Sequence, residues 1–362
     1  MRDGLLKSNS IEGIQYLRGI AALLVVLFHI DLAVIKTNFG MSVGYVGVDI
    51  FFIISGFVMA HTTRNLKLSN TKERITEFAL FLKKRFIRVI PLYWIATIFT
   101  YRRELIHGEI QSELFKDLMF VPHFNLEYTS LIQPKLAQGW TLNYEMFFYA
   151  LFALSILFGQ YRLRLVALFF ACLVIAGKAL DFYGYSPELD SFKYVLVNFY
   201  TNDILLEFVL GIVAQKTISK WSWSFGSKSI NLILLVTAFM MLFIGAHFYS
   251  GAMRFLLLGV PAYFIVIFAI KSFEGTEIRV LKILGDASYA IYLFHFTSFG
   301  LLKPMAPWFN QFSTSYLGTL LVILSYAAIS VASGVAIHLF LEKPLTRIFG
   351  NSTKATRVRV FE

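Results

Sequence analysis

The stretch that decides the fold is LRGIAALLVVLFHI, residues 17–30, an apolar run with Arg18 near its start and His29 near its end. These two residues are eleven positions apart, and eleven helical steps of about 100° come within about 20° of a whole number of turns. Both side chains therefore share one face, roughly 16 Å apart along the axis. Polar groups on one face of a bilayer-compatible helix indicate function.

The composition is that of an integral membrane protein. Of the 362 residues, 57% are hydrophobic and 15% are charged, and the mean hydropathy is positive. This is too apolar for a soluble domain of this length. The net charge is +11, but the basic residues lie between apolar runs instead of forming the continuous stripe of a nucleic-acid-binding surface. Membrane topology explains them better.

The single cysteine, Cys172, lies inside an apolar run, which excludes an internal disulfide and a cysteine-based metal site. We expect no metal. The run that starts at Ile14 is about 22 residues long and has no small-residue cleavage site, so it predicts a retained signal-anchor helix.

The apolar runs predict an all-α integral membrane protein, a bundle of about ten transmembrane helices. The expected spans are 14–35, 43–60, 86–101, 140–158, 165–180, 194–214, 230–248, 255–270, 287–302 and 316–341. If both termini lie inside, the inner segments hold 23 of the 33 Lys and Arg residues and the outer ones 8, which favours an N-in, C-in orientation. We expect one transmembrane domain over 1–345, a short basic cytoplasmic tail over 346–362, and polar connections at 65–84 and 102–139.

Titratable or charged residues inside the expected spans are costly and mark candidate functional groups. They are Arg18, His29, Asp31, Asp49, Glu145, Lys178, Asp203, Glu207 and His295. At about 1.5 Å per residue, four of these groups lie roughly 7 to 10 Å below the outer surface. These four are His29, Asp49, Glu145 and His295. We expect them to converge.

A second, basic cluster lies in FLKKRFIRVIP, where Arg85 and Arg88 are neighbours on one helical face at the expected inner mouth. Pro91 follows and is expected to kink the helix. Paired guanidinium groups bind phosphate by charge-assisted hydrogen bonds. The pair is therefore a candidate phosphate site.

Structural roles stay open for several of these residues. Arg85 with Arg88 could be a positive-inside anchor, Asp49 could make a helix-to-helix hydrogen bond, and His295 could be a satisfied core histidine. Trp140 could be an interfacial anchor, and Lys178, Asp203 and Glu207 could form structural ion pairs. His29 fits a structural role least, because its face also carries Arg18 and its depth matches that of Glu145.

These positions suggest a long anionic donor that reaches from an inner phosphate-binding mouth to an outer reaction centre. Coenzyme A has this shape, with phosphates at one end and a thioester at the other. His29 could act as a general base toward an acceptor hydroxyl, with Asp49 or Glu145 orienting it or stabilising its protonated form. An apolar bundle would help to exclude water.

Five motifs resemble those of the membrane-bound acyltransferase-3 family, whose members O-acylate carbohydrates and a few other extracytoplasmic molecules. In order they are RGIAALLVVLFH, GVDIFFIISGF, RFIRVIP, WTLNYEMFFY and SYAIYLFH. The resemblance runs from Ile11 to about Leu345. It implies a ten-helix bundle, an acyl-CoA donor bound from the cytoplasm, and an acceptor modified on the far side.

Residue by residue, the resemblance implies that His29 is the catalytic histidine and that Asp49 and Glu145 are supporting acids. Whether the first-helix arginine touches the donor or only shapes its path stays open. On this basis the expected donor contacts are Arg18, Arg85 and Arg88, and the expected acceptor contacts are Trp140 and His295.

The sequence therefore predicts a multi-pass acyl-CoA-dependent O-acyltransferase of the cytoplasmic (inner) membrane, in the first place an O-acetyltransferase using acetyl-CoA. Its expected acceptor is an exported or cell-surface polysaccharide, such as an exopolysaccharide. Some members of the family carry an esterase-like domain after the last helix. We expect none here, and we therefore expect direct transfer or a separate periplasmic or glycan-assembly partner. We expect contacts with bilayer lipid, acyl-CoA and carbohydrate, and none with nucleic acid.

Two other classes stay open at this point. A proton-coupled transporter of a small solute would also place charged groups at mid-depth, but the chain has no inverted repeat and no clearly broken helix pair. A non-catalytic membrane scaffold would leave the aligned Arg18 and His29 unexplained.

Overall fold

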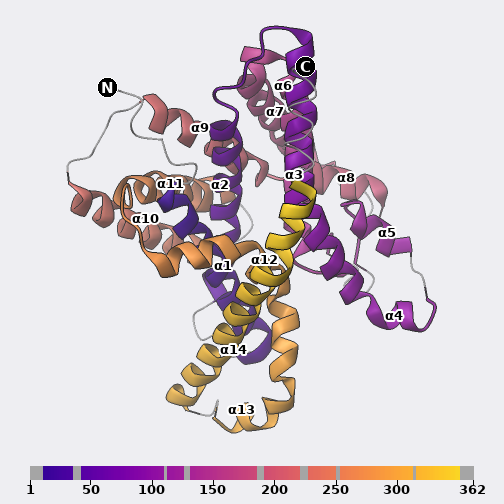
Figure 1. Cartoon of the computed structure of the whole chain (residues 1–362), viewed down its shortest axis with the longest axis vertical. Coiled ribbons are helices and arrows are strands. Elements are labelled where there is room, and N and C mark those ends of the chain that lie inside the picture. The colour runs from indigo at the N-terminus through magenta and orange to yellow at the C-terminus, as the bar shows by residue number, and fades with distance from the viewer. Residues whose placement is uncertain are drawn as a thin grey trace. The chain divides into compact units, whose positions relative to one another are not determined.

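Helices make up nearly all of the regular structure in the computed structural model, as Figure 1 shows. The structure describes residues 11–35, 42–109, 112–125, 131–185, 191–220, 227–249, 253–312 and 315–350. Within these ranges, β-structure is limited to one isolated antiparallel bridge between Phe124 and Ile132. The expected all-α class is confirmed.

The α-helices vary from short turns to a helix of 30 residues. They are α1 (Glu12–Ile30), α2 (Gly47–Thr62), α3 (Thr71–Thr100), α4 (Arg102–Ile106), α5 (Ser112–Leu118), α6 (Gly139–Ile156), α7 (Arg162–Phe182), α8 (Phe192–Tyr200), α9 (Leu205–Lys220), α10 (Lys228–Phe248), α11 (Val260–Ser272), α12 (Arg279–Leu302), α13 (Ala306–Phe312) and α14 (Tyr316–Ile337). Short 3-10 and π segments are η2 (Asp31–Ile35), η3 (Ser42–Val46), η4 (Gly159–Tyr161), η5 (Phe255–Gly259), η6 (Lys303–Met305) and η7 (His338–Glu342).

The chain forms two compact units, each built from two separate parts of the sequence. The first unit comprises residues 1–57 and 213–339, and the second comprises residues 58–212 and 340–362. The predicted boundary between a domain over 1–345 and a tail over 346–362 stays a prediction, because residues 351–362 lie outside the described ranges.

Seven helical segments in the described ranges, some of them made of two consecutive elements, are long and apolar enough to cross a membrane. They are Glu12–Ile30, Val43–Thr62, Gly159–Phe182, Phe192–Lys220, Lys228–Phe248, Phe255–Ser272 and Tyr316–Gly350. Each overlaps an expected span. The other three expected spans fall in α3, α6 and α12, the helices that carry Arg85, Glu145 and His295. The count of ten spans and the N-in, C-in orientation stay predictions.

The polar stretch 65–84 is not a connection, so this expectation was wrong: α3 begins at Thr71. Oδ1 of Asn70 accepts a hydrogen bond from the Glu73 N–H (2.9 Å), and the Glu73 carboxylate accepts one from the Ser69 N–H (2.8 Å). Such reciprocal capping starts a helix among polar residues. Hydropathy alone misses this helix start.

The expected single helix over 194–214 is interrupted. α8 ends at Tyr200 and α9 begins at Leu205, with Oδ1 of Asn202 accepting a hydrogen bond from the Ile204 N–H (3.0 Å). Asparagine side chains compete with helical hydrogen bonding in this way and favour turns. The apolar run thus contains a turn that its composition does not reveal.

In the first unit, α1 packs extensively against α12, and α12 against α14. Gly285 of α12 permits close approach, because a Cβ atom at this position would lie 2.0 Å from the carbonyl oxygen of Gln15 in α1. Further along both helices, His29 contacts His295. The two helices therefore run in the same direction, and their packing fixes side chains near both ends of the contact.

Stacked aromatic side chains fill the core of the second unit. The rings of Phe148 and Phe208 stack with centroids 4.0 Å apart, and those of Phe81 and Phe152 stack at 5.3 Å. Phe170 of α7 is fully buried beside Phe148. Aromatic burial of this kind contributes much of the packing energy of a core, and it joins α3, α6, α7 and α9.

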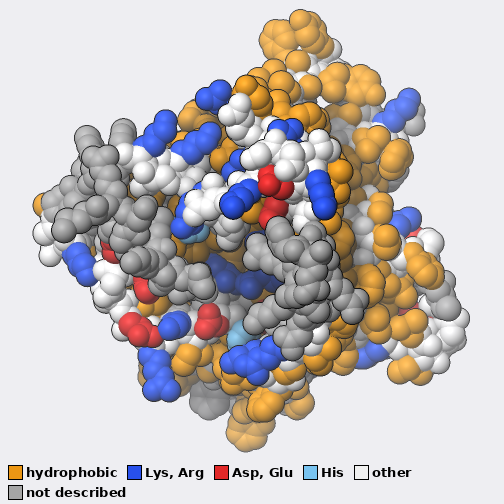
Figure 2. All heavy atoms as spheres, turned by 45° about the horizontal axis from the view of Figure 1, so that its top comes forward, with side chains coloured by type: hydrophobic (Ala, Val, Ile, Leu, Met, Phe, Trp, Pro, Cys, Tyr) orange, Lys and Arg blue, Asp and Glu red, His pale blue; other side chains and the backbone are white. Residues whose placement is uncertain are grey.

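Apolar side chains also point outward along three of the apolar helices, α7, α10 and α14. The exposed ones include Leu168, Ile175, Phe182, Ile233, Met240, Ile244, Leu317, Leu321 and Leu324. Their spacing of three, four or seven residues forms a stripe along each helix. Figure 2 shows apolar flanks beside a face on which Lys and Arg side chains gather. Such stripes suit contact with lipid chains.

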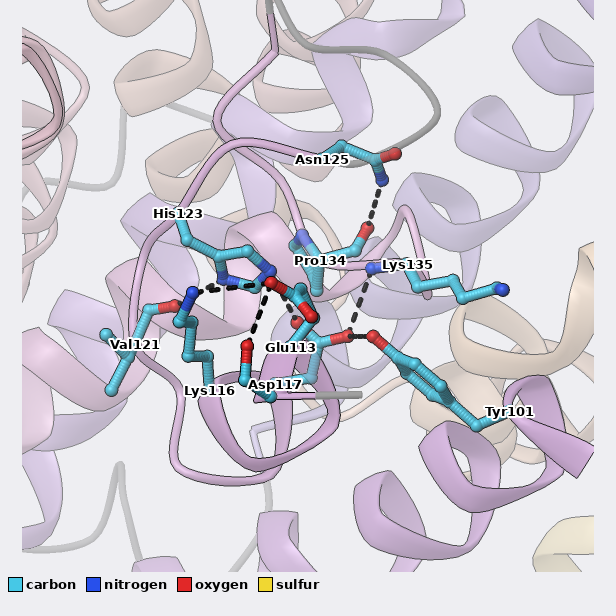
Figure 3. A network of polar contacts seen from close by, with 10 residues as sticks. Tyr101, Glu113, Lys116, Asp117, Val121, His123, Asn125, Pro134 and Lys135 are labelled. Carbon is cyan, nitrogen blue, oxygen red and sulfur yellow. Dashed lines mark hydrogen bonds and ion pairs between the residues drawn. The ribbon is translucent and has the colours of Figure 1, made fainter. Parts of the chain in front are cut away.

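The expected polar connection between α3 and α6 folds around the buried carboxylate of Asp117 (Figure 3). Tyr101 donates its hydroxyl hydrogen to Oδ2 (2.8 Å), and the backbone N–H of Lys135 donates to the same oxygen (3.1 Å). Nε2 of His123 lies 3.4 Å from Oδ1. The Lys135 ammonium binds Glu104 at 2.5 Å. The described part of this segment, which includes α4 and α5, is therefore held together by polar contacts.

Candidate active site

The candidate histidines meet in the first unit. His29 lies one residue before the end of α1, where the helix passes into the π segment η2. Its Nδ1 lies 2.9 Å from the carbonyl oxygen of Val25 and 3.2 Å from Nε2 of His295. His295 is fully buried in α12, and His29 is partly exposed. The expected convergence of these two residues is thus observed in the structure.

Asp49 lies in the first turn of α2, in the same unit, and is fully buried. Nη2 of Arg254, the residue before η5, lies 2.8 Å from its Oδ1. The Arg254 guanidinium also lies 5.8 Å from the ring centroid of Tyr249. The ion pair observed for Asp49 is therefore with Arg254, a residue that the sequence did not single out.

Arg18 lies eleven residues before His29 on the same continuous helix, as the shared-face prediction requires. Its Nη1 donates to Oε1 of Gln15 (3.0 Å), whose amide donates in turn to Asp286 of α12 (3.3 Å). The guanidinium is thus held at the α1–α12 contact, near the opposite end of α1 from His29.

The second unit holds the arginine pair. Arg85 and Arg88 are both in α3, one turn apart. The Arg85 guanidinium lies 5.7 Å from the ring centroid of Tyr149, whose hydroxyl donates to the Glu145 carboxylate, one turn earlier in α6. It also lies 5.5 Å from the ring centroid of Phe81. Arg85 therefore belongs to one cluster with Tyr149 and Glu145.

This placement differs from the expected one, in which Arg85 lies at an inner mouth and Glu145 in the outer half of the membrane. The reason is the length of α3. Because α3 starts at Thr71, Arg85 falls near its middle instead of at its first turn. There it faces α6.

Trp140 lies in the first turn of α6 and packs edge-on against Tyr144, with ring centroids 6.0 Å apart. Tyr144 stacks in turn on Phe199 of α8 at 3.9 Å. Trp140 thus ends a row of aromatic rings in the second unit, and it is partly exposed. This position fits both an interfacial anchor and a contact for a sugar ring.

The structure therefore brings together His29 with His295, and Arg85 with Glu145. Sequence reasoning missed Arg254 and Tyr149. The spacing of Tyr149 four residues after Glu145 could have identified it, whereas Arg254 is about 200 residues from its partner and has no local signal. In the described part of the chain, no group of three or more His, Cys, Asp or Glu side chains could hold a metal ion.

Comparison with known proteins identifies the family of this chain. The model of a family described as an acyltransferase domain matches residues 11–339. The chain belongs to this acyltransferase family. The match covers both histidines, the Asp49–Arg254 pair and the cluster around Arg85, so all of the candidate site lies within the family domain. The resemblance of the five motifs is confirmed.

Individual relatives agree with the family. The exopolysaccharide production protein ExoZ of Rhizobium meliloti (strain 1021) is 29% identical over 345 residues, which cover 89% of this chain and 94% of that protein. The acyltransferase MdmB of Streptomyces mycarofaciens is 25% identical over 340 residues, which cover 85% of this chain and 82% of that protein. The O-acetyltransferase OatA of Staphylococcus aureus (strain NCTC 8325 / PS 47) is 24% identical over 315 residues, which cover 79% of this chain and 50% of that protein. No solved structure matches the chain.

The protein is thus a multi-pass membrane acyltransferase that transfers groups other than aminoacyl groups. Membership in this family favours the acyltransferase over the transporter and the scaffold. As an acyltransferase it needs an acyl donor.

Proposed function

We propose that this acyltransferase transfers an acyl group, in the first place acetyl, from acyl-CoA on the cytoplasmic side to a hydroxyl group of an exported or cell-surface polysaccharide. We place it in the cytoplasmic (inner) membrane, with both termini inside and ten spans. Transfer is direct or passes through a separate periplasmic or glycan-assembly partner.

The observation that carries this proposal is the environment of His29. The imidazole sits at the end of α1, is partly exposed, and has its Nδ1 engaged by Val25 and His295. An imidazole nitrogen that keeps its lone pair can take a proton, which suits a general base. His29 takes the proton of the acceptor hydroxyl, an acyl C–O bond forms as the acyl C–S bond breaks, and the proton ends on the departing thiolate.

Arg85 and Arg88 are the proposed contacts for the phosphates of the donor. The buried Nε of Arg85 has no hydrogen-bond acceptor among the described residues. Aromatic rings of Phe81 and Tyr149 hold its guanidinium plane in place. A pre-organised guanidinium loses little entropy when it binds phosphate. These features fit an anionic donor such as acyl-CoA, which would supply an activated thioester when bound. Arg18 is the further proposed donor contact, on α1.

Asp49 and Glu145 are the proposed supporting acids. Asp49 acts together with Arg254, so this pair adds little net charge near the reacting groups. Glu145 accepts a hydrogen bond from Tyr149 and interacts electrostatically with Arg85. The two acids thereby keep basic groups in place while the hydroxyl proton moves.

The proposed acceptor is a polysaccharide because ExoZ, aligned over nearly its whole length, is named for exopolysaccharide production. Sugar rings stack on exposed aromatic side chains, and Trp140 is partly exposed at the end of α6. We assign Trp140 and His295 to the acceptor side of the site.

Mass spectrometry of surface polysaccharide tests this proposal. A host strain that lacks the protein should lose a defined acyl substituent, and the wild-type gene should restore it. His29→Ala should fail to restore it at equal membrane abundance, whereas His247→Ala, at an exposed position of α10, should restore it fully. Polysaccharide that is unchanged in the strain lacking the protein would refute the proposed acceptor class.

A further inference from the structure

The contact between His29 and His295 indicates a role for His295 in orienting His29. We infer that His295 is a positioning residue, which holds the ring of His29 in one orientation and in the tautomer that leaves Nε2 free to take a proton. This inference rests on the proposed function, because it concerns the same base. It gives His295 a part in the reaction that does not require contact with the acceptor.

The proton of His295 can be located from its backbone contact. Nδ1 of His295 lies 2.7 Å from the carbonyl oxygen of Tyr292. A carbonyl oxygen can only accept a hydrogen bond, so Nδ1 carries the hydrogen. The ring is fully buried beside Phe296 and Phe299, where an uncompensated charge would be costly. In the neutral ring Nε2 therefore holds a lone pair and is an acceptor.

The proton of His29 follows from this assignment. Its Nδ1 faces two acceptors, Nε2 of His295 at 3.2 Å and the carbonyl oxygen of Val25 at 2.9 Å. Nδ1 of His29 consequently carries the hydrogen and shares it between them. In the neutral imidazole the lone pair then lies on Nε2, at the far side of the ring from both contacts. The base atom is Nε2.

The two acceptors do different work because they belong to different helices. Val25 is one turn before His29 on α1, so its carbonyl moves with the histidine and selects a tautomer without anchoring the ring elsewhere. His295 belongs to α12 and anchors the ring against a second helix. The rings of Phe28 and Phe296 pack edge-on against His29, with centroids 4.9 Å and 4.7 Å away, and limit its rotation.

The arrangement also suits the protonated state that catalysis creates. When Nε2 of His29 takes the hydroxyl proton, the ring becomes an imidazolium, and its Nδ1–H becomes a stronger donor to the two acceptors. His295 keeps its own proton on Nδ1, because Tyr292 still requires a donor there. The charge thus stays on His29, and the proton remains available for the leaving thiolate.

Nitrogen NMR of protein with 15N-labelled histidine side chains tests the tautomers directly, at a pH where imidazoles are neutral. Protonated and unprotonated ring nitrogens differ in chemical shift, and the seven histidines can be assigned by single substitutions. We expect Nδ1 protonated and Nε2 unprotonated in both His29 and His295. A hydrogen on Nε2 of His29 in the wild-type protein would overturn the inference, whatever the activity.

Two variants separate positioning from packing. In His295→Gln, Oε1 replaces Nε2 as the acceptor for His29, whereas His295→Leu fills similar space with no acceptor. His295→Leu should mix the two tautomers of His29 and lower kcat roughly 10- to 100-fold with little change in KM for acetyl-CoA. It should also alter the pH profile of kcat, and His295→Gln should recover most of the loss. An unmixed tautomer and an unchanged pH profile in His295→Leu would contradict the inference.

The same experiments distinguish this inference from the proposed function. If His29→Gln retained full activity, the assignment of His29 as base would fail even if the NMR confirmed its tautomer. If His29→Gln were inactive but the wild-type tautomer were the opposite one, the positioning role of His295 would fail and the base assignment would stand.

Discussion

Arg254 and Asp49 form a buried ion pair in the first unit, with Nη2 2.8 Å from Oδ1 and the carboxylate fully buried. The two residues come from different parts of the chain, the start of α2 and the segment before η5. A buried charge needs a partner because its desolvation is costly. The pair therefore ties the N-terminal helices of this unit to its C-terminal helices.

Removal of one member of this pair should destabilise the protein more than removal of both. Arg254→Met should cost about 3–5 kcal/mol, because it takes away the cation that compensates the buried carboxylate of Asp49. Combining Arg254→Met with Asp49→Asn should recover a large part of that loss. Thermal unfolding in detergent micelles measures both effects. Equal midpoints for Arg254→Met and the wild type would contradict the structural importance of the pair.

The close approach of α1 and α12 predicts a difference between two glycines of the same helix. Gly285→Ala should lower the unfolding midpoint and the activity, because its Cβ would meet the Gln15 carbonyl oxygen at 2.0 Å and overpacking costs about 1–3 kcal/mol. Gly300→Ala is the matched control, since nothing lies within 4 Å of a Cβ there. Similar effects of both substitutions, measured by thermal unfolding and acyl transfer, would argue against this packing.

The all-α membrane class could be predicted from the sequence, because membrane helices carry long, local hydropathy signals. His29 could be chosen as a candidate from its helix alone, since a polar side chain in an apolar segment is conspicuous. His295 could be proposed as its neighbour because the two residues lie at a similar depth in their helices. The hydrogen bond between them could not be predicted, because it depends on the tertiary packing of α1 against α12.

Three other features could not be predicted: the start of α3, the break before α9 and the partner of Asp49. They depend on hydrogen bonds of polar side chains or on contacts between residues far apart in the sequence. The early start of α3 comes from side-chain capping by Asn70 and Glu73, and polar capping residues give no hydropathy signal. The break before α9 comes from a turn at Asn202. The partner of Asp49 is about 200 residues away, and one sequence contains no information that pairs them.

The proposed donor site predicts that loss of two particular charges on α3 affects donor binding. Arg85→Gln with Arg88→Gln should raise KM for acetyl-CoA about tenfold or more, because charge-assisted hydrogen bonds contribute about 1.5–3 kcal/mol each. Lys72→Gln with Lys84→Gln removes two exposed charges from the same helix and should leave KM nearly unchanged. If both pairs raised KM equally, the arginines would return to the role of a positive-inside anchor.

The Asp117 cluster predicts a pH dependence of stability. Burial raises the pKa of the Asp117 carboxyl above its usual range, although Tyr101 and His123 partly oppose this shift. The folded protein therefore binds this proton more tightly than the unfolded chain does. The resulting stabilisation is fully present below the unfolded value of about 3.9 and is lost as pH rises through the folded pKa.

Thermal unfolding between acidic and neutral pH checks this sign. Wild-type protein should lose stability relative to Asp117→Asn as pH rises through that window, because asparagine does not ionise. Asp181→Asn, at an exposed position of α7, should show the same pH dependence as the wild type. A wild-type protein that gained stability over Asp117→Asn with rising pH would show that the pairing with His123 outweighs burial.

His29 is the proposed base for transfer from acyl-CoA to a sugar hydroxyl, and this role decides the mechanism. It is tested most directly by acceptor-dependent release of CoA from acetyl-CoA by the purified protein in lipid nanodiscs, with polysaccharide from a strain lacking the protein as acceptor. Wild-type protein and His247→Ala should form CoA and acetylated polysaccharide in equal amounts, and folded His29→Ala should form neither. Undiminished product from His29→Ala, or no CoA from the wild type, would contradict the claim.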